Sequence, residues 1–219
     1  MYRSAAPEWM TSKGWDDARA SGVATIFDLR NEMERGRCQD HPVLRSHDMA
    51  GVTVVHAPTE DPDDEQFLAE CGPWLDHPRS WTPNLRLFPD KITGVLAAIA
   101  DASRPLLIHC AGGRDRTGMI GSMLLALADA TPKSIVANYE AGFWGAALHR
   151  GHGYTFNPES TGFGASPTQP WTQGDLDTAL ADRQGLLLEW VEAFDVPTYL
   201  LDSGVSEKQL GRLQQLLLG

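Results

Sequence analysis

The sequence predicts an α/β fold with a central, mostly parallel sheet of four or five strands flanked by helices. Three short apolar runs, at 23–29, 52–56 and 106–109, are typical of strands, and the first is rich in β-branched and aromatic residues. Segments with the apolar spacing of helices lie between and after these runs. Strands that alternate with helices along a chain favour a parallel sheet.

The first two strands are bounded by residues that interrupt regular structure. Gly22 precedes the run VATIFDL at 23–29, and Pro58 stops the region of the run VTVVH at 52–56. The segment TEDPDDE at 59–65 then predicts an acidic loop.

The helices are predicted from apolar spacing and from capping residues. Residues 92–99 carry Ile, Val, Leu and Ile at positions i, i+3, i+4 and i+7. Residues 115–129 are apolar nearly all round, which is typical of a central, buried helix. Thr131 before Pro132 is an N-cap followed by proline at the first helical position. Apolar residues at 176–194 predict another helix, and Ser206 with Gln209 forms a capping box that starts the last one.

One segment within the predicted single domain (residues 1–219) lacks these patterns. Residues 142–174 hold seven glycines and three prolines, with Trp144 and Tyr154 among them. This composition predicts a long surface loop or lid. Its aromatic residues are candidates for stacking on a phosphorylated ring or for anchoring the loop.

Charge and cysteine content exclude some classes of protein. The chain has 219 residues, and its 18 basic and 29 acidic residues give a net charge of −11, which disfavours nucleic-acid binding. Cys38, Cys71 and Cys110 contain no C-x-x-C pair, so neither a zinc ribbon nor a disulfide framework is indicated. No metal or organic cofactor is expected, and a reducing compartment is the simpler interpretation.

The sequence shows no targeting or membrane-spanning pattern. Residues 1–8 lack the apolar core of a signal peptide, and the most apolar run, at 119–128, is too short to span a bilayer. We therefore expect a cytoplasmic protein without stable membrane attachment.

The segment HCAGGRDRTG, from His109 to Gly118, carries the chemistry. It lies between a predicted strand and a predicted helix, where the first helical N–H groups and the helix dipole favour an anion. Gly112 and Gly113 allow the backbone to curl and to approach that anion closely. Arg116 can donate two parallel hydrogen bonds to phosphate oxygens.

Cys110 stands at the start of this loop, where it can act as a nucleophile. Helix N-termini and nearby cations lower the pKa of a thiol from about 8.5 to roughly 3.5–7.5. A loop that holds a phosphate dianion would therefore also hold a thiolate, which can attack phosphorus in line and form a cysteinyl-phosphate. Thr117 can hydrogen-bond the sulfur when it leaves, and His109 is expected to orient the loop.

These residues resemble a known family. The pattern His109-Cys110-x5-Arg116-Thr117-Gly118 resembles the C-x5-R loop of protein tyrosine phosphatases. With Asp115 before the arginine, it is similar to the bacterial tyrosine phosphatases with an H-C-x-x-G-K-D-R-T-G loop, some of which also dephosphorylate phosphoinositides. Here Arg114 replaces the common lysine, so the resemblance does not decide between protein and lipid phosphate.

Two further motifs, together with Gly204-Val205-Ser206 before the Leu-rich last helix, extend the resemblance over most of the chain. Arg3-Ser4-Ala5 resembles the R-S-(A/G) opening of that group, and Asp28-Leu29-Arg30 with Glu34 resembles its D-L-R-x-x-x-E motif. The resemblance implies a tyrosine-phosphatase-like fold. From position alone, Asp28 and Arg30 are interpreted as a structural ion pair, and Glu34 and Arg37 are interpreted in the same way.

The general acid has two candidate sources. Asp115 lies inside the loop, and in the resembled group the matching residue is implicated in catalysis, although capping of the next helix would also explain it. The acidic loop offers Asp61, with Asp63 and Asp64, because other tyrosine phosphatases supply their acid from a separate loop. Asp115 is preferred, and Asp61 comes next.

The sequence thus predicts a cysteine-dependent phosphatase acting on phosphotyrosine, with phosphoserine, phosphothreonine and phosphoinositide left open as substrates. The alternatives are an inositol-polyphosphate phosphatase and a phosphate-binding module without turnover. The expected catalytic residues are Cys110, Arg116 and Asp115. The expected substrate-binding residues are Ala111, Gly112, Gly113, Arg114 and Thr117, with Arg114 at the rim of the pocket.

Overall fold

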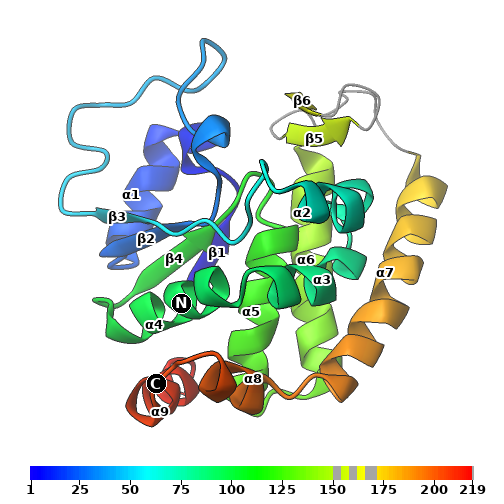
Figure 1. Cartoon of the computed structure of the whole chain (residues 1–219). Coiled ribbons are helices and arrows are strands. Elements are labelled where there is room, and N and C mark those ends of the chain that lie inside the picture. The colour runs from blue at the N-terminus through cyan, green and yellow to red at the C-terminus, as the bar shows by residue number, and fades with distance from the viewer. Residues whose placement is uncertain (150–153, 158–161, 166–171, 219) are drawn as a thin grey trace.

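The central sheet has four parallel strands in the order β1-β4-β2-β3 (Figure 1). The computed structural model describes residues 1–149, 154–157, 162–165 and 172–218. The strands are β1 (Tyr2–Ser4), β2 (Thr25–Asp28), β3 (Thr53–His56) and β4 (Leu106–His109). Every pairing in this sheet is parallel, so the carboxyl ends of all four strands meet at one edge. The predicted α/β class and the small parallel sheet are confirmed.

Helices cover both faces of the sheet. The helices are α1 (Ser12–Ala20), α2 (Glu65–Glu70), α3 (Trp81–Leu87), α4 (Pro89–Asp101), α5 (Asp115–Leu127), α6 (Pro132–Leu148), α7 (Gln173–Ala193), α8 (Val196–Asp202) and α9 (Glu207–Gln215). Short 3₁₀ helices lie at Pro7–Trp9, Glu32–Glu34, Gly72–Trp74 and Pro78–Ser80. A separate antiparallel pair is formed by β5 (Tyr154–Asn157) and β6 (Gly162–Ala165).

Alternate residues of the buried strands face two different cores. Ile26 and Leu107 pack with Trp15 of α1 on one face. Phe27 and Ile108 join the larger core on the other face, which α3 to α9 supply. Because successive strand side chains point to opposite faces, strands buried on both sides are apolar at nearly every position. This arrangement explains why the sequence shows continuous apolar runs.

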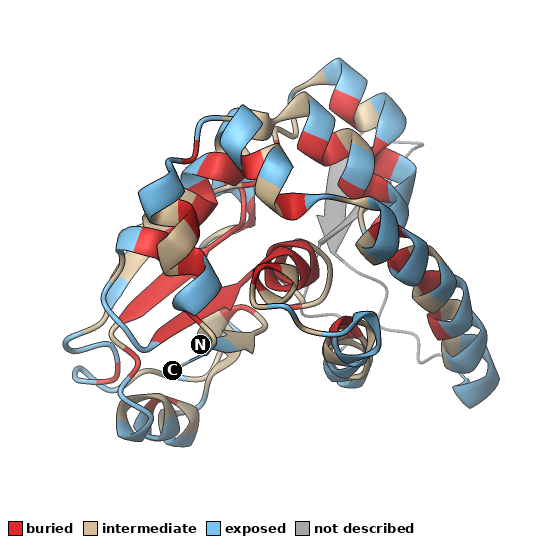
Figure 2. Ribbon diagram, turned by 90° about the horizontal axis from the view of Figure 1, so that it is seen from below, coloured by how far each residue is buried: buried red, intermediate tan, exposed pale blue. Residues whose placement is uncertain are grey.

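The helix α5 is the central helix of the larger core. Nine of its residues are buried, including Met119, Ile120 and Leu124. Figure 2 shows the inner strands β2 and β4 and this helix largely in the colour of buried residues. The sequence prediction of a central, buried helix is therefore confirmed, and the helix begins directly after the loop that carries the candidate chemistry.

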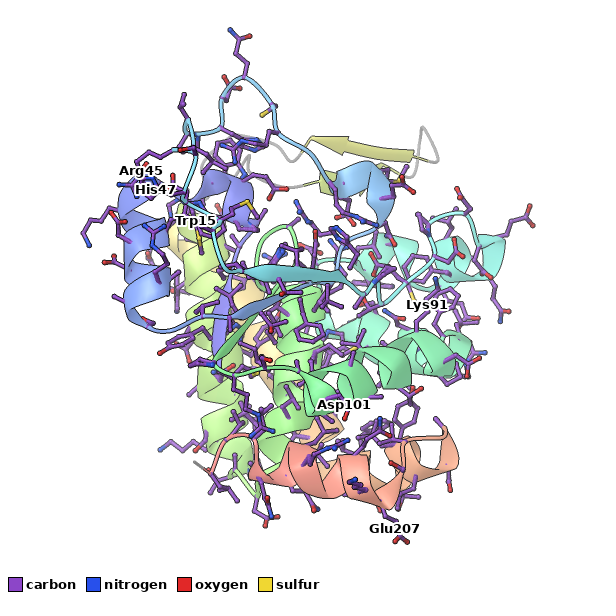
Figure 3. All side chains as sticks on the ribbon, turned by 90° about the vertical axis from the view of Figure 1, so that its left-hand side faces the viewer. Trp15, Arg45, His47, Lys91, Asp101 and Glu207 are labelled. Atoms are coloured by element: carbon purple, nitrogen blue, oxygen red, sulfur yellow. The ribbon has the colours of Figure 1, made fainter. Side chains whose placement is uncertain are left out.

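Ion pairs on the surface join segments to the helices beside them. Arg45 forms an ion pair with Asp16 of α1, and Figure 3 shows Arg45 and His47 beside that helix and Trp15. Asp101, at the end of α4, pairs with Arg212 of α9, and it lies between these two helices in Figure 3.

The helix starts follow the predicted caps, whereas one strand and one loop differ from the prediction. Thr131 caps α6 and Ser206 caps α9, both by accepting a hydrogen bond from the backbone three residues on. The strand β1 was not predicted, because three residues are too few to show alternation.

The prediction of a loop over 142–174 is wrong at its start. The helix α6 runs on to Leu148, and within it Gly142 lies against the guanidinium of Arg3 and Ala146 lies against Gly112. Part of the remainder is the β5–β6 pair, and the part between and around these strands, including Arg150, lies outside the described residues. Within the described chain, no helix is long and apolar enough to cross a bilayer.

Candidate active site

The loop of residues 110–116 connects the buried strand β4 to α5 at the carboxyl edge of the sheet. It is held from one side by the segment that follows β1, where Ala6 donates its N–H to the carbonyl of Ala111 at 2.9 Å. Gly113 adopts a positive φ of +67°, and a Cβ at this position would overlap the carbonyl oxygen of Ser4. The loop therefore requires glycine at 113 for two separate reasons.

Arg3 fastens the loop to α6. Its guanidinium donates to the carbonyl oxygen of Gly113 at 2.7 Å and to Asn138 Oδ1 at 2.6 Å. Gly142 of α6 leaves room for this guanidinium, which a Cβ there would overlap. The opening Arg-Ser motif thus acts as a brace that fixes the curl of the loop.

The curl leaves a series of backbone donors without acceptors. Within the described part of the chain, none of the backbone N–H groups from residue 111 to residue 117 donates to a protein acceptor, and the first such bond runs from Gly118 to the carbonyl of Arg114. Unpaired N–H groups at a helix N-terminus attract an anion, and the helix dipole adds to that attraction. The loop is therefore suited to binding an anion.

The side chains beneath the loop are buried. Cys110 is 3% exposed, and Thr117 is fully buried with its hydroxyl oxygen unpartnered in the described structure. His109 Nδ1 lies 3.1 Å from the carbonyl oxygen of Cys110, and its Nε2 lies 3.7 Å from Asp28. Burial lowers the pKa of His109, which favours the neutral ring. These contacts suit a residue that orients the loop.

Arg116 is held by two carboxylates. Both terminal nitrogens of its guanidinium lie 2.5 Å from the oxygens of Glu34, and Nη1 lies 3.1 Å from Glu60 Oε1. A guanidinium has five N–H donors. Glu34 takes one N–H from Nη1 and one from Nη2, at the end of the group, and Glu60 takes the second N–H of Nη1. The donors that remain, on Nε and Nη2, form the side-on fork that matches two oxygens of a phosphoryl group.

The D-L-R-x-x-x-E motif builds the support of Glu34. Asp28 and Arg30 form a buried ion pair at 2.8 Å, which confirms the interpretation of these two residues as structural. Arg30 also donates to the carbonyl oxygen of Glu34 at 3.3 Å, and the N–H of Asn31 donates to Glu34 Oε2 at 2.9 Å. The expectation of a structural pair of Glu34 with Arg37 is wrong, because Glu34 pairs with Arg116 in the candidate site, whereas Arg37 donates to the carbonyl oxygen of Pro42.

Asp115 lies in the first turn of α5 among mixed charges. Its carboxylate accepts from Arg114 Nε at 2.9 and 3.1 Å and from the hydroxyl of Tyr139 at 3.4 Å. Burial raises the pKa of Asp115, and the nearby charge of Asp76 adds to the rise. A carboxyl group of this kind keeps its proton to higher pH than an exposed aspartate does.

Arg114 extends toward α6 and toward Asp76. Besides Asp115, its guanidinium pairs with Asp76 at 3.3 Å and lies 5.7 Å from the centre of the Phe143 ring. Only 16% of its side chain is exposed. In this arrangement its charge is directed at Asp115 and Asp76, and its contact with substrate stays a prediction.

The acidic loop contributes a residue that sequence reasoning missed. Asp61 accepts from the N–H of Asp63 in a local turn, and Asp64 caps α2 by accepting from Phe67. Glu60, in contrast, is 5% exposed and reaches Arg116. Its position just after β3, at the edge where parallel strands place ligands, is the sequence signal that could have found it.

The other singled-out residues lie in different settings. Cys38 is exposed, whereas Cys71 is buried against the carbonyl oxygen of Ser80, and burial raises its pKa to about 12. Trp144 lies on α6, where its indole donates to Glu140 at 3.4 Å. The side chain of Tyr154 lies outside the described residues.

The fold and the loop define this chain as a parallel α/β domain with a loop suited to binding an anion. That loop begins with a buried cysteine and ends with an arginine that is paired with two carboxylates. The model of the tyrosine phosphatase family matches residues 1–219, and the chain therefore belongs to this family. It is accordingly an enzyme that hydrolyses phosphoric monoesters, and the predicted family is confirmed. No curated protein matched the chain.

Proposed function

We propose that this phosphatase hydrolyses phosphotyrosine monoesters through a cysteinyl-phosphate, with Cys110 as the nucleophile. The observation that carries the proposal is the curled loop, in which the backbone N–H groups of 111–117 are without protein acceptors in the described part of the chain. The buried thiol stands at the start of that loop, and the open fork of Arg116 stands at its end. A phosphoryl group bound by both would lie over the sulfur.

Binding uses the loop and Arg116 together. The N–H groups of residues 111–116 donate to the non-bridging oxygens, and Nε and Nη2 of Arg116 donate to two of them. In the transition state, negative charge spreads over the equatorial oxygens of the phosphoryl group. The N–H groups of the loop and of Arg116 already point to these oxygens, so they stabilise that charge without moving. Ala111, Gly112 and Gly113 contribute backbone, and the braces from Arg3 and Ala6 hold that backbone in place.

The first chemical step transfers the phosphoryl group to sulfur. The Cys110 thiolate attacks phosphorus, a P–S bond forms, and the bond from phosphorus to the phenolic oxygen breaks. Asp115 donates its proton to the departing oxygen, which its raised pKa favours. Asp61, the other candidate acid, is engaged in its own turn, so the geometry favours Asp115.

The second step returns the enzyme to its starting state. A water molecule attacks phosphorus while the Asp115 carboxylate takes its proton, and the P–S bond breaks to release phosphate and the thiolate. The buried hydroxyl of Thr117 lacks a protein partner among the described residues and is available to hydrogen-bond the departing sulfur. Both steps together leave Asp115 and Cys110 in their original protonation states.

The charge distribution around the site supports a single phosphoryl group over a polyphosphorylated substrate. Arg114 and Arg183 both pair with Asp76, and Arg3 is used by the loop and α6. An inositol polyphosphate would need additional cations without acidic partners. Phosphoserine, phosphothreonine and phosphoinositide monoesters remain substrates for the assay panel.

Hydrolysis of a small aryl phosphate, with a chelator present, tests the proposal. We expect the wild type to turn over and Cys110→Ser to lose at least about 10³-fold in kcat, because a hydroxyl is a far weaker nucleophile than a thiolate. Cys38→Ser is the matched control, since Cys38 is exposed, and it should keep wild-type activity. Equal activity of Cys110→Ser and Cys38→Ser would overturn the nucleophile assignment.

A further inference from the structure

Glu60 is a buried carboxylate that the reaction described above does not use. It follows β3 at the carboxyl edge of the sheet and is 5% exposed. Its Oε1 lies 3.1 Å from Arg116 Nη1 and accepts a long hydrogen bond, 3.4 Å, from the side-chain amide of Asn31. The residue therefore contacts the arginine that binds phosphate and a residue of the turn that positions Glu34.

The charges around Glu60 do not balance. Arg116 supplies one positive charge to two carboxylates, those of Glu34 and Glu60, and the further acidic group on α5, Asp115, is paired with Arg114. Burial raises the pKa of Glu60 to about 7, with Glu34 and Asp115 adding to the rise and Arg116 opposing it. Cys71 also faces Glu60, and its thiol stays neutral because its pKa is raised to about 12.

Glu34 behaves differently, although it contacts the same guanidinium. It meets Arg116 with both oxygens and accepts the N–H of Asn31, and the charge and hydrogen bond of Arg116 hold its pKa below the usual range. Glu34 is therefore ionised near neutral pH, whereas Glu60 is close to its midpoint. When a dianion enters beside Arg116, Glu60 is the carboxylate that can be neutralised most readily.

We propose that Glu60 is a positioning residue of Arg116 whose protonation follows the occupancy of the site: ionised, it holds the guanidinium in the empty enzyme, and it takes up one proton from solvent when a tetrahedral dianion binds. This inference rests on the proposed binding of phosphate by the 110–116 loop and Arg116. Proton uptake changes only the Glu60 carboxylate into a carboxylic acid, and no other bond forms or breaks.

The proposal has a consequence for affinity. With Glu60 and Glu34 both ionised, these two carboxylates and Arg116 together carry a net negative charge, which repels an incoming dianion. Protonation of Glu60 removes this net charge. Binding of a dianion is then linked to one proton, so the affinity falls about tenfold per pH unit above the pKa of Glu60 in the empty site. Below that pKa, the affinity levels off.

Calorimetric titration with tungstate tests this linkage. Tungstate is a tetrahedral oxyanion that stays a dianion near pH 8, so the ligand itself takes up no proton there. The titrations use Cys110→Ser, which removes the thiol from the site, in two buffers of different ionisation enthalpy, whose comparison counts the protons taken up. The same titrations are made with Glu60→Gln and with Glu65→Gln added to that background, because Glu65 is an exposed glutamate nearby.

We expect about one more proton per bound tungstate in Cys110→Ser than after Glu60→Gln is added, and no change after Glu65→Gln. The affinity should fall about tenfold from pH 8 to pH 9 in Cys110→Ser and stay nearly flat with Glu60→Gln. If Glu60→Gln fails to fold by circular dichroism, Glu60→Ala replaces it, since it also removes the carboxylate.

Two results would overturn the inference, and they differ in what else they overturn. Tungstate binding with the same proton count with and without Glu60 would refute the role of Glu60 and leave the proposed phosphatase site standing. If tungstate does not bind to Cys110→Ser at all, the anion-binding loop itself is wrong, and the proposed function fails together with this inference.

Discussion

Replacement of Gly113 by alanine is the most direct test of how the loop is built. Gly113 has a φ of +67°, a conformation that costs an L-residue about 1–2 kcal/mol. The added Cβ would also overlap the carbonyl of Ser4, and forcing an extra group into a packed site costs about 1–3 kcal/mol. The two effects together destabilise the fold by about 3 kcal/mol.

Two other glycines separate these costs. Gly51 has a similar φ of +78°, and no atom lies within 4 Å of the place that a Cβ would occupy, so Gly51→Ala carries the backbone cost without the overlap. Gly145 lies within α6 with equally open surroundings, and Gly145→Ala should stabilise the helix by about 0.5–1 kcal/mol. The difference between Gly113→Ala and Gly51→Ala therefore measures the overlap with Ser4.

Thermal denaturation and aryl phosphate hydrolysis are the assays. For a chain of this length, a loss of about 3 kcal/mol lowers Tm by about 6–12 °C. Gly113→Ala should also lower kcat/KM by at least about tenfold, because a shifted loop misdirects its N–H donors, whereas Gly51→Ala should leave it unchanged. Equal stability and equal activity of Gly113→Ala and Gly51→Ala would refute the claim that the Ser4 carbonyl shapes the loop.

Three further outcomes are expected. Asp115→Asn should lose about 10²–10³-fold in kcat on phenyl phosphate but much less on p-nitrophenyl phosphate, whose leaving group needs no proton. The acid must be protonated to act, and its pKa is raised, so the wild-type rate on phenyl phosphate should fall as pH rises through that pKa. This decline should be absent from Asp115→Asn. Arg116→Lys should lose about 10²–10³-fold in kcat/KM despite keeping the charge, since an ammonium cannot replace the fork, and near-normal kinetics would contradict the bidentate contact. Iodoacetamide near pH 7.5 should modify Cys38 and spare Cys71, because Cys71 is buried with a pKa of about 12, and peptide mass spectrometry that finds both modified at the same rate would contradict this.

Local patterns predicted the elements that make up the frame of the site. The run LLIH forms β4 with the bounds 106–109, and the all-round apolar segment after it forms α5. Thr131 and Ser206 cap helices as expected. These features depend on neighbours within a few residues, so the sequence contains the physics that determines them.

The segment 142–174 and the strand β1 show where local reasoning fails. The glycine content suggested a loop, but Gly142 lies inside the helix α6. A glycine stands at this helical position because the guanidinium of Arg3 occupies the space that a side chain would fill. Three residues form β1 because β4 provides a parallel partner for them. Both outcomes are set by segments that are distant in the chain, which no local pattern reports.

The sequence by itself determined where the curled loop lies, between a strand and a helix, and predicted a phosphate site there from a cysteine, two glycines and an arginine, because a helix N-terminus and its donors are local properties. Only the tertiary structure decided the surroundings of Arg116. Glu34 and Glu60 are distant in sequence from Arg116, and they meet it because parallel strands end at one edge of the sheet. Burial at that edge and the unequal contacts with Arg116 then shift their pKa values in opposite directions, which depends on distances that a linear sequence does not contain.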